Sequence, residues 1–431
     1  MGDTSKSELA ALGGPPAFSR RPPKYPEFSP EALTRLCRVL ADGPTQGLSK
    51  QHPEVGEFES RLARFHGVEH CLSASSGHGA LQSALIGLEM TDGDEVITSP
   101  YSWGASVSCI LHNGAVPTFC DVLPDTGLMD PDRLQDALSP RTRAILVPHL
   151  YGQPADMTAI MKFARKHDLW VIEDGSQAHG ARHAGRPIGS FGHAAGFSIN
   201  GVKPLASAEG GYLTTRLEDV YWKATISCQH AGRGELIGRA SEPGFPDDLR
   251  GYIDSLVYTY RPNIVSLVLA LDRLPHLEEE NNARRANAHL LRRLLKDSEL
   301  FAFPFYSDDD HQVFHMVTLN VRRLVRGVGR DEVLGALQAE GVPAVAYVER
   351  GLNLSPRMSP KWSGPRVMWT ESIRRSGQDP TQLRLPGCEE KVATSIEIPW
   401  NYVHRDDDLV ADMAAAFKKV EANLPALADL R

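Results

Sequence analysis

Two residues in the first half of the chain combine a reactive type with an unusual setting. Asp174 ends the apolar segment Trp170–Asp174, where burial of a carboxylate is costly unless a cation faces it. The candidate partners are a protonated ring nitrogen, a metal ion or a structural salt bridge. Lys203 stands among small residues in a loop between two apolar segments, where loss of water would lower the pKa of its amine. A neutral lysine amine can act as a nucleophile, although most lysines are solvated surface charges.

A glycine-rich turn at residues 76–79, Ser-Gly-His-Gly, is a candidate anion site. It precedes a helical pattern with Leu81, Leu85 and Leu88 on one face. Glycine lets the backbone approach an anion closely, and the first N–H groups of the helix would suit a phosphate. The turn matches neither a P-loop nor the full dinucleotide-binding pattern, so a tight turn that merely opens a helix is the alternative.

Two further side chains follow predicted strand ends. Trp103 comes shortly after the segment Glu95–Thr98 and could stack on a flat heterocycle or fill the edge of the core. Gln177 lies three residues after Asp174 and could donate a hydrogen bond to a ring oxygen.

The elements that would position these residues alternate between strand and helix patterns. Strands are predicted at residues 71–74, 95–98, 116–122, 144–150, 170–174, 196–199 and 211–215. Such alternation is typical of a mostly parallel sheet covered by helices. Ligands of open α/β sheets collect at the carboxyl ends of the strands, so the candidate residues should lie at one edge.

Beyond about residue 275 the pattern changes to that of a smaller α+β unit. A charged amphipathic helix is predicted at 277–295, further helices at 330–341 and 407–424, and strands at 313–321 and 396–399. We therefore predict an N-terminal arm and helix over residues 1–50, a large domain over 51–290 and a small C-terminal domain over 291–431. The stretch 354–382, rich in Pro, Ser and Gly, is predicted to be a long surface loop.

Composition excludes several classes of function. The formal net charge of −8 argues against broad nucleic-acid binding, which needs clustered Lys and Arg. The six cysteines are scattered without metal-ligand spacing, so we expect no metal site and free thiols in a reducing cytoplasm. No segment approaches the roughly 18 apolar residues of a membrane span, and we expect no secretory leader and no membrane partner.

The ordered segments SGHGAL, GDEVITSPYSW, NGAVPTFCDV, VPHLYGQPADM, VIEDGSQAHGA, FSINGVK and AEGGYLTT resemble the DegT/DnrJ/EryC1/StrS aminotransferases. These are fold-type I enzymes that depend on pyridoxal 5'-phosphate (PLP) in sugar and antibiotic biosynthesis. The resemblance runs from about residue 28 to the C-terminus. It implies an α/β fold, with a large PLP-binding domain built on a mainly parallel seven-stranded sheet and a smaller C-terminal α+β domain.

The resemblance also implies roles for single residues. Lys203 matches the Schiff-base lysine, and Asp174 matches the acid that pairs with the pyridine nitrogen. Gln177 matches the residue beside the ring hydroxyl, and Trp103 the aromatic side chain that stacks on the ring.

For the phosphate, the resemblance points to a cradle formed by Gly77, His78 and Ser198. The family usually has Thr at the position of His78, which leaves the backbone N–H groups as the expected donors. Thr259 and Arg261 match an Asn-x-Arg motif whose asparagine reaches the phosphate of the neighbouring subunit. Thr259 departs from that motif but retains a hydrogen-bonding hydroxyl.

The implied reaction is ping-pong transamination. The amino donor would be glutamate or glutamine, and the acceptor a keto or aldehyde group of a sugar, cyclitol or similar intermediate in antibiotic or secondary-metabolite biosynthesis. Two alternatives share the scaffold: a PLP-dependent sugar dehydratase, which has His in place of Lys203, and a non-catalytic PLP-binding regulator. A plain nucleotide-binding module is a third. The family also implies a homodimer, and the apolar run 264–271 must lie in the core or in such an interface.

Overall fold

The computed structural model describes residues 9–42, 52–229, 247–253, 256–304, 311–322, 325, 327–365 and 367–428. The predicted α/β architecture is confirmed, with a seven-stranded sheet, a three-stranded sheet and a two-stranded hairpin among the described residues. No helix among these residues is long and apolar enough to cross a membrane.

The central sheet has seven strands in the order β1-β9-β8-β5-β4-β2-β3. They are β1 (His70–Ala74), β2 (Glu95–Thr98), β3 (Val116–Phe119), β4 (Thr142–Pro148), β5 (Trp170–Asp174), β8 (Ala194–Ser198) and β9 (Gly211–Thr215). Only β9 runs antiparallel to its neighbours, β1 and β8, whereas the other strand pairs are parallel. All strands except β9 therefore end at the same edge, as predicted.

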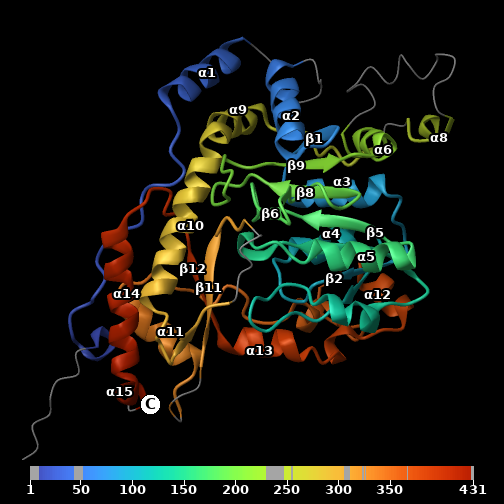
Figure 1. Cartoon of the computed structure of the whole chain (residues 1–431). Helices are drawn as coiled ribbons and strands as arrows, with labels where there is room; N and C mark the ends of the chain where they lie inside the picture. Colours follow the sequence, from blue (N-terminus) through green and yellow to red (C-terminus); the bar gives the residue numbers. More distant parts are fainter. Residues whose placement is uncertain are drawn as a thin grey trace, which may run out of the picture.

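Helices cover both faces of this sheet (Figure 1). They are α2 (Pro53–His66), α3 (Gly77–Gly87), α4 (Ala105–His112), α5 (Met157–His167), α6 (Glu218–Cys228) and α9 (Ile264–Arg273). Successive residues of β5 pack on opposite faces of the sheet. Ile172 contacts the core formed with α3, α4 and α6, and Val171 contacts the core formed with α5. Other strand residues on the face of Val171 pack against α2 and α9.

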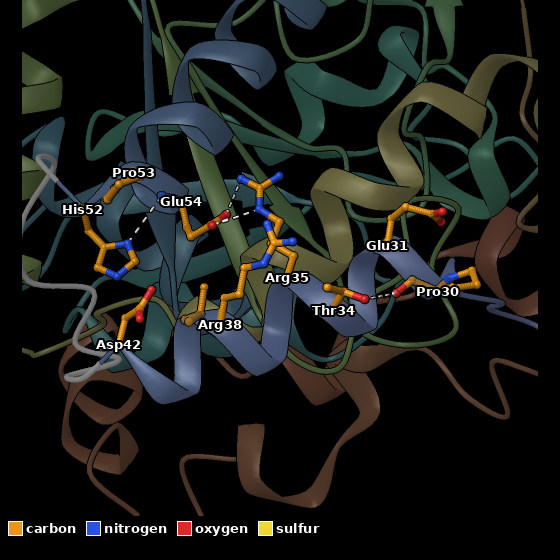
Figure 2. A pocket seen from close by; sticks show the side chains of 10 residues that line it. Pro30, Glu31, Thr34, Arg35, Arg38, Asp42, His52, Pro53 and Glu54 are labelled. Atoms are coloured by element: carbon orange, nitrogen blue, oxygen red, sulfur yellow. Dashed lines mark hydrogen bonds and ion pairs between the residues drawn. The ribbon is translucent and has the colours of Figure 1, made fainter.

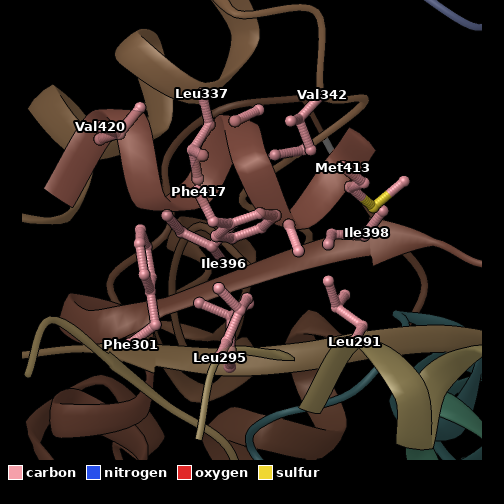
Figure 3. Close-up of a cluster of buried hydrophobic side chains, with 14 of the residues drawn as sticks. Leu291, Leu295, Phe301, Leu337, Val342, Ile396, Ile398, Met413, Phe417 and Val420 are labelled. Carbon is pink, nitrogen blue, oxygen red and sulfur yellow. The ribbon is translucent and has the colours of Figure 1, made fainter. Parts of the chain in front are cut away.

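The small sheet is antiparallel, in the order β10-β11-β12. Its strands are β10 (Phe301–Ala302), β11 (Met316–Val321) and β12 (Ser395–Pro399). The helices around it are α10 (Leu277–Leu294), α11 (Arg330–Ala339), α14 (Asp407–Ala422) and α15 (Leu424–Ala428). Figure 3 shows Leu291, Ile396 and Phe417 in the core that joins these elements.

The remaining described elements lie outside these two cores. They are α1 (Pro30–Ala41), α8 (Asp247–Arg250), α12 (Thr370–Ser376), α13 (Pro386–Thr394), the hairpin strands β6 (Arg182–His183) and β7 (Arg186–Pro187), and 3-10 turns at Ala10–Leu12, Pro131–Ala137, Leu150–Gly152, Leu274–His276, Leu352–Leu354, Pro356–Met358 and Pro380–Gln382.

Three predictions need comment. The stretch 354–382 is not a long surface loop, because it forms α12 and two 3-10 turns and buries Met358 and Ile373 against α4. The apolar run 264–271 belongs to the core of this chain, where α9 packs on α2, and so gives no support for a dimer. The predicted boundary at residue 290 falls inside α10, and the division into domains stays a prediction.

Candidate active site

A cavity of about 440 Å³ opens at the carboxyl edge of the central sheet. The predicted site residues that line it are Gly77, His78, Trp103, Asp174, Gln177, Ser198 and Lys203. They come from the ends of β1, β2, β5 and β8, which the parallel topology brings to one place.

Asp174 is buried, with 8% of its surface exposed, and its carboxylate is held from two sides. Oδ2 accepts a hydrogen bond of 2.7 Å from the Ser106 hydroxyl of α4, and Oδ1 accepts one of 3.1 Å from the Ser176 N–H. Ser106 in turn lies 2.9 Å from the Ser102 hydroxyl. These bonds fix the orientation of the carboxylate toward the cavity. The sequence gives no local signal for Ser106, which is one of several serines in an ordinary helical pattern.

Glu173, next to Asp174, points to the other face of the sheet and has a different environment. Its oxygens accept bonds of 2.7 to 2.8 Å from the N–H groups of Gly189, Phe191 and Gly192, and His149 Nε2 lies 3.2 Å away. Burial opposes ionisation, but these donors outweigh it and lower the pKa of Glu173. Glu173 therefore ties a loop to the sheet and does not line the cavity.

Lys203 lies in the loop between β8 and β9, and its side chain is partly buried. Burial lowers the pKa of its amine, and the charge of Asp174 opposes this shift. Its backbone N–H donates to Asn200 O at 2.9 Å, whereas Nζ makes no hydrogen bond or ion pair within the described part of the chain. The backbone of Lys203 is therefore held by a hydrogen bond, whereas its amine is not.

The turn at residues 76–79 forms the amino end of α3, where the Ser76 hydroxyl caps the helix by accepting from Gly79 N at 3.0 Å. A Cβ on Gly77 would come within 2.6 Å of Ser198 Cβ, so glycine is required for the two strand ends to approach. The first-turn N–H groups and the positive end of the helix dipole face the cavity and suit an anion.

The ring of His78, which also lines the cavity, has both nitrogens beside residues of α4. Its Nδ1 lies 3.2 Å from the Ser108 hydroxyl and its Nε2 lies 3.0 Å from His112 Nδ1. Burial and the neighbouring His112 lower the pKa of His78, which favours a neutral ring. The backbone, and not this side chain, is therefore the available anion donor at this position.

The mouth of the cavity is aromatic. Trp103 is 61% exposed, and its ring centroid lies 6.1 Å from that of Tyr347. Gln177 Oε1 accepts from Tyr151 N at 2.7 Å, and Gln177 Nε2 donates to the Tyr347 hydroxyl at 3.3 Å. Burial, with the charge of Asp174, raises the pKa of Tyr347 to about 12, so its hydroxyl stays protonated. Sequence reasoning missed Tyr347 because it comes from the C-terminal part of the chain with no motif around it.

Thr259 and Arg261 do not line the cavity of their own chain. Thr259 is exposed, with a left-handed φ of 55°. The segment nevertheless touches the cradle, because Ser75 N donates to Tyr260 O at 3.0 Å. That these two residues contact a cofactor phosphate stays a prediction.

A second, wider hollow of about 820 Å³ lies between α1 and α2 (Figure 2). Within its wall Arg35 Nε donates to Glu54 at 2.9 Å. Asp42 and His52 in its wall flank residues 43–51, which are outside the described chain. We assign no function to this hollow. Among the described residues, no cluster of His, Cys, Asp and Glu has the arrangement of a metal site.

Comparison with known proteins places this geometry in context. The DegT/DnrJ/EryC1/StrS aminotransferase family model matches residues 35–373. The L-glutamine:2-deoxy-scyllo-inosose aminotransferase of Streptomyces paromomycinus is 32% identical over 426 residues, which cover 96% of this chain and 97% of the relative. The enzyme of the same name from Micromonospora echinospora is 33% identical over 432 residues, with 96% and 98% covered. Among solved structures, the aminotransferase from Psychrobacter cryohalolentis superposes with a TM-score of 0.82 at 26% identity, covering 94% of this chain and all of that one.

Proposed function

The chain belongs to the DegT/DnrJ/EryC1/StrS aminotransferase family and is an aminotransferase, and we propose that it uses PLP to transfer the amino group of glutamine to the keto group of a cyclitol or sugar. The observation that carries the proposal is the convergence, in one cavity, of a buried carboxylate, a desolvated lysine and the amino end of a helix.

These three features fit the three recognition groups of PLP. The first-turn N–H groups of α3 would bind the phosphate beside Ser198, whose close approach Gly77 permits. Asp174, oriented by Ser106, would pair with the protonated ring nitrogen. Lys203 would hold the aldehyde carbon through Nζ. When bound, PLP supplies an electron sink for the charge that develops on the donor.

The side chains of the cavity would transfer protons and position the cofactor and the substrates. Asp174 would keep a proton on the ring nitrogen because a facing carboxylate favours the cationic form. Lys203 Nζ, whose pKa is lowered by burial, would accept the proton that leaves the α-carbon of the amino donor. Trp103, whose ring lies near that of Tyr347, would cover the cofactor ring, and Gln177, which donates to the Tyr347 hydroxyl, would hold the ring hydroxyl.

The acceptor class follows from the relatives and from the cavity wall. Two relatives that match nearly the whole chain are named as glutamine-dependent aminotransferases of 2-deoxy-scyllo-inosose, a cyclitol ketone. The wall beyond Lys203 carries Asn200 and Glu209, whose side chains lie 2.6 Å apart, and both can bind hydroxyl groups. A polyhydroxylated ring is thus a better match for this wall than an apolar ketone.

A homodimer and a cytoplasmic location are part of the same proposal. Helix α1 presents Leu33 and Leu40, which are 55% and 60% exposed, so it has an apolar face for a second copy. Thr259 and Arg261 would then face the cradle of the partner. The six cysteines form no disulfide with one another, which fits a reducing compartment.

The test is covalent trapping of the cofactor. The protein loaded with PLP is treated with borohydride, digested and mapped by mass spectrometry, with Lys203→Arg as the control. We expect the adduct on Lys203 and none in the control. Glutamine and 2-deoxy-scyllo-inosose are then supplied to the untreated enzyme, and the amine product is followed. An adduct on another lysine would overturn the assignment of Lys203. Loss of water from the acceptor without use of glutamine would instead indicate a dehydratase.

A further inference from the structure

The N-terminal arm, residues 9–29, is bound first to the small domain. The Glu340 carboxylate accepts bonds of 2.8 Å from both Ala10 N and Ala17 N, and Phe18 is buried in the small-domain core. Arg20 forms an ion pair of 2.8 Å with Asp412 of α14. In Figure 1 this blue segment runs beside α14 before it reaches α1.

The same arm then contacts the loop that carries Lys203. The Tyr25 hydroxyl lies 2.7 Å from Lys203 O and 2.7 Å from Pro204 O. Its ring lies under two guanidinium groups, with Arg284 at 5.1 Å and Arg273 at 5.6 Å from the ring centroid. The next anchor follows at once, because Arg273 donates to the carbonyl of Glu27 at 3.0 Å.

The Tyr25 hydroxyl is a donor in this setting. Burial raises the pKa of Tyr25, and although the charge of Arg284 opposes that shift, the phenol remains protonated. Both atoms that it faces are backbone carbonyl oxygens, which can only accept. Its single proton is shared between the Lys203 and Pro204 carbonyls.

We propose that Tyr25 is a positioning residue for Lys203, an inference that rests on the proposed role of that lysine. The Lys203 peptide is fixed on its amide side by Asn200 O and on its carbonyl side by Tyr25. Because Nζ itself has no partner among the described residues, its place in the cavity depends on the backbone that carries it. Loss of the Tyr25 hydroxyl frees that backbone and moves Nζ away from its desolvated position near Asp174.

Removal of the Tyr25 hydroxyl alone tests this positioning role. Tyr25→Phe removes the hydroxyl and keeps the ring under both guanidinium groups. Tyr402→Phe is the matched control, since Tyr402 is also buried and its hydroxyl has no hydrogen-bond partner among the described residues. The first readout is made on the cofactor-free protein. Trace acetic anhydride labels amines across a pH series, and peptide mass spectrometry gives the pKa of the Lys203 amine.

In Tyr25→Phe we expect this pKa to rise toward the ordinary lysine value. With cofactor and both substrates, we expect kcat to fall about tenfold while KM for glutamine stays near wild type, because misplacement of a reacting group by a fraction of an ångström acts on the chemical step. Tyr402→Phe should change neither quantity, whatever it does to the melting temperature.

The outcomes separate the two proposals. If borohydride fails to label Lys203 in the wild-type protein, the proposed function is wrong. If the wild type is labelled but Tyr25→Phe keeps the wild-type kcat and the wild-type amine pKa, only the positioning role is wrong. Equal changes in Tyr25→Phe and Tyr402→Phe would also overturn it, because they would reflect a general loss of stability.

Discussion

Two adjacent carboxylates, Glu173 and Asp174, should respond in opposite ways to the same change from acid to amide. They stand on neighbouring positions of β5 and therefore point to opposite faces of the sheet. Asp174 lines the cavity, whereas Glu173 holds backbone N–H groups of the loop after β7. We expect Asp174→Asn to lose turnover and keep the fold, and Glu173→Gln to lose stability.

The magnitudes follow from the donors that each carboxylate faces. In Glu173 each oxygen has two: Gly189 N and His149 Nε2 on Oε2, and Phe191 N and Gly192 N on Oε1. Whichever way a glutamine amide is placed, its NH₂ group faces two donors. At roughly 1.5–3 kcal/mol for each hydrogen bond to a charged group, the free energy of unfolding should fall by roughly 3–6 kcal/mol.

Asp174 has one donor on each oxygen, and one of them is the hydroxyl of Ser106, which can rotate and accept from an amide. The cost to the fold is therefore small, on the order of 1 kcal/mol. The amide cannot hold a proton on the ring nitrogen. Turnover should fall roughly 10²-fold or more, the scale of a positioned acid–base partner.

Urea denaturation of the cofactor-free variants, followed by circular dichroism, measures the first quantity. Product formation from glutamine and the cyclitol ketone, divided by the folded fraction, measures the second. Near-normal turnover in a folded Asp174→Asn protein would refute the assignment of the cofactor partner. A Glu173→Gln protein with wild-type stability would show that the four donors do not set the energy of this loop.

Three further changes test the site and its surroundings. Ser106→Ala removes the hydroxyl that orients Asp174 and should lower kcat about tenfold in steady-state assays. An unchanged kcat would show that this hydroxyl does not orient the carboxylate. Gly77→Ala places a Cβ 2.6 Å from Ser198 Cβ and should weaken PLP binding about tenfold in an absorbance titration, and unchanged affinity would exclude this cradle as the phosphate site. Burial lowers the pKa of His66 from 6.5 to about 4. Between these pH values the unfolded chain binds a proton on His66 and the folded chain does not. The free energy of unfolding should therefore decrease by up to about 3 kcal/mol as the pH falls from 6.5 to 4. Urea midpoints for His66→Gln should show a shallower acid slope, and an equal slope would assign the loss to other groups.

The sequence predicts the central sheet well because parallel strands buried on both faces are continuous apolar segments. Carboxylates within them are conspicuous, as Glu173 and Asp174 are at the end of β5, and the resemblance to the family then pointed to Asp174. The segment 354–382 shows the opposite case. Its helix α12 is only seven residues long, and the few apolar residues that it buries do not form a periodic pattern. Polar composition therefore indicated a loop where the chain is folded.

The side chains that support the site could not be predicted because their partners are remote in sequence. Ser106 and its hydrogen-bond partner Asp174 are 68 residues apart in the sequence. The separation is 170 residues for Tyr347 and Gln177, and 178 residues for Tyr25 and the Lys203 carbonyl. Serine and tyrosine are ordinary in the segments that carry them. Their roles arise only when the fold brings those segments together.

The side-chain amine of Lys203 has no hydrogen bond among the described residues, whereas its backbone has two, and this contrast explains why residues distant in sequence matter to the site. An amine that must bind a carbonyl carbon and then carry a proton cannot be held by permanent hydrogen bonds, and within the described chain Nζ has none. An amine without fixed partners stays in position only if the backbone that carries it is held rigidly. Asn200 and Tyr25 supply that rigidity on the two sides of the Lys203 peptide, one from its own loop and one from the N-terminal arm. Because the arm is also bound to Glu340 and α14, the position of the Lys203 amine depends on contacts that begin beside the small sheet.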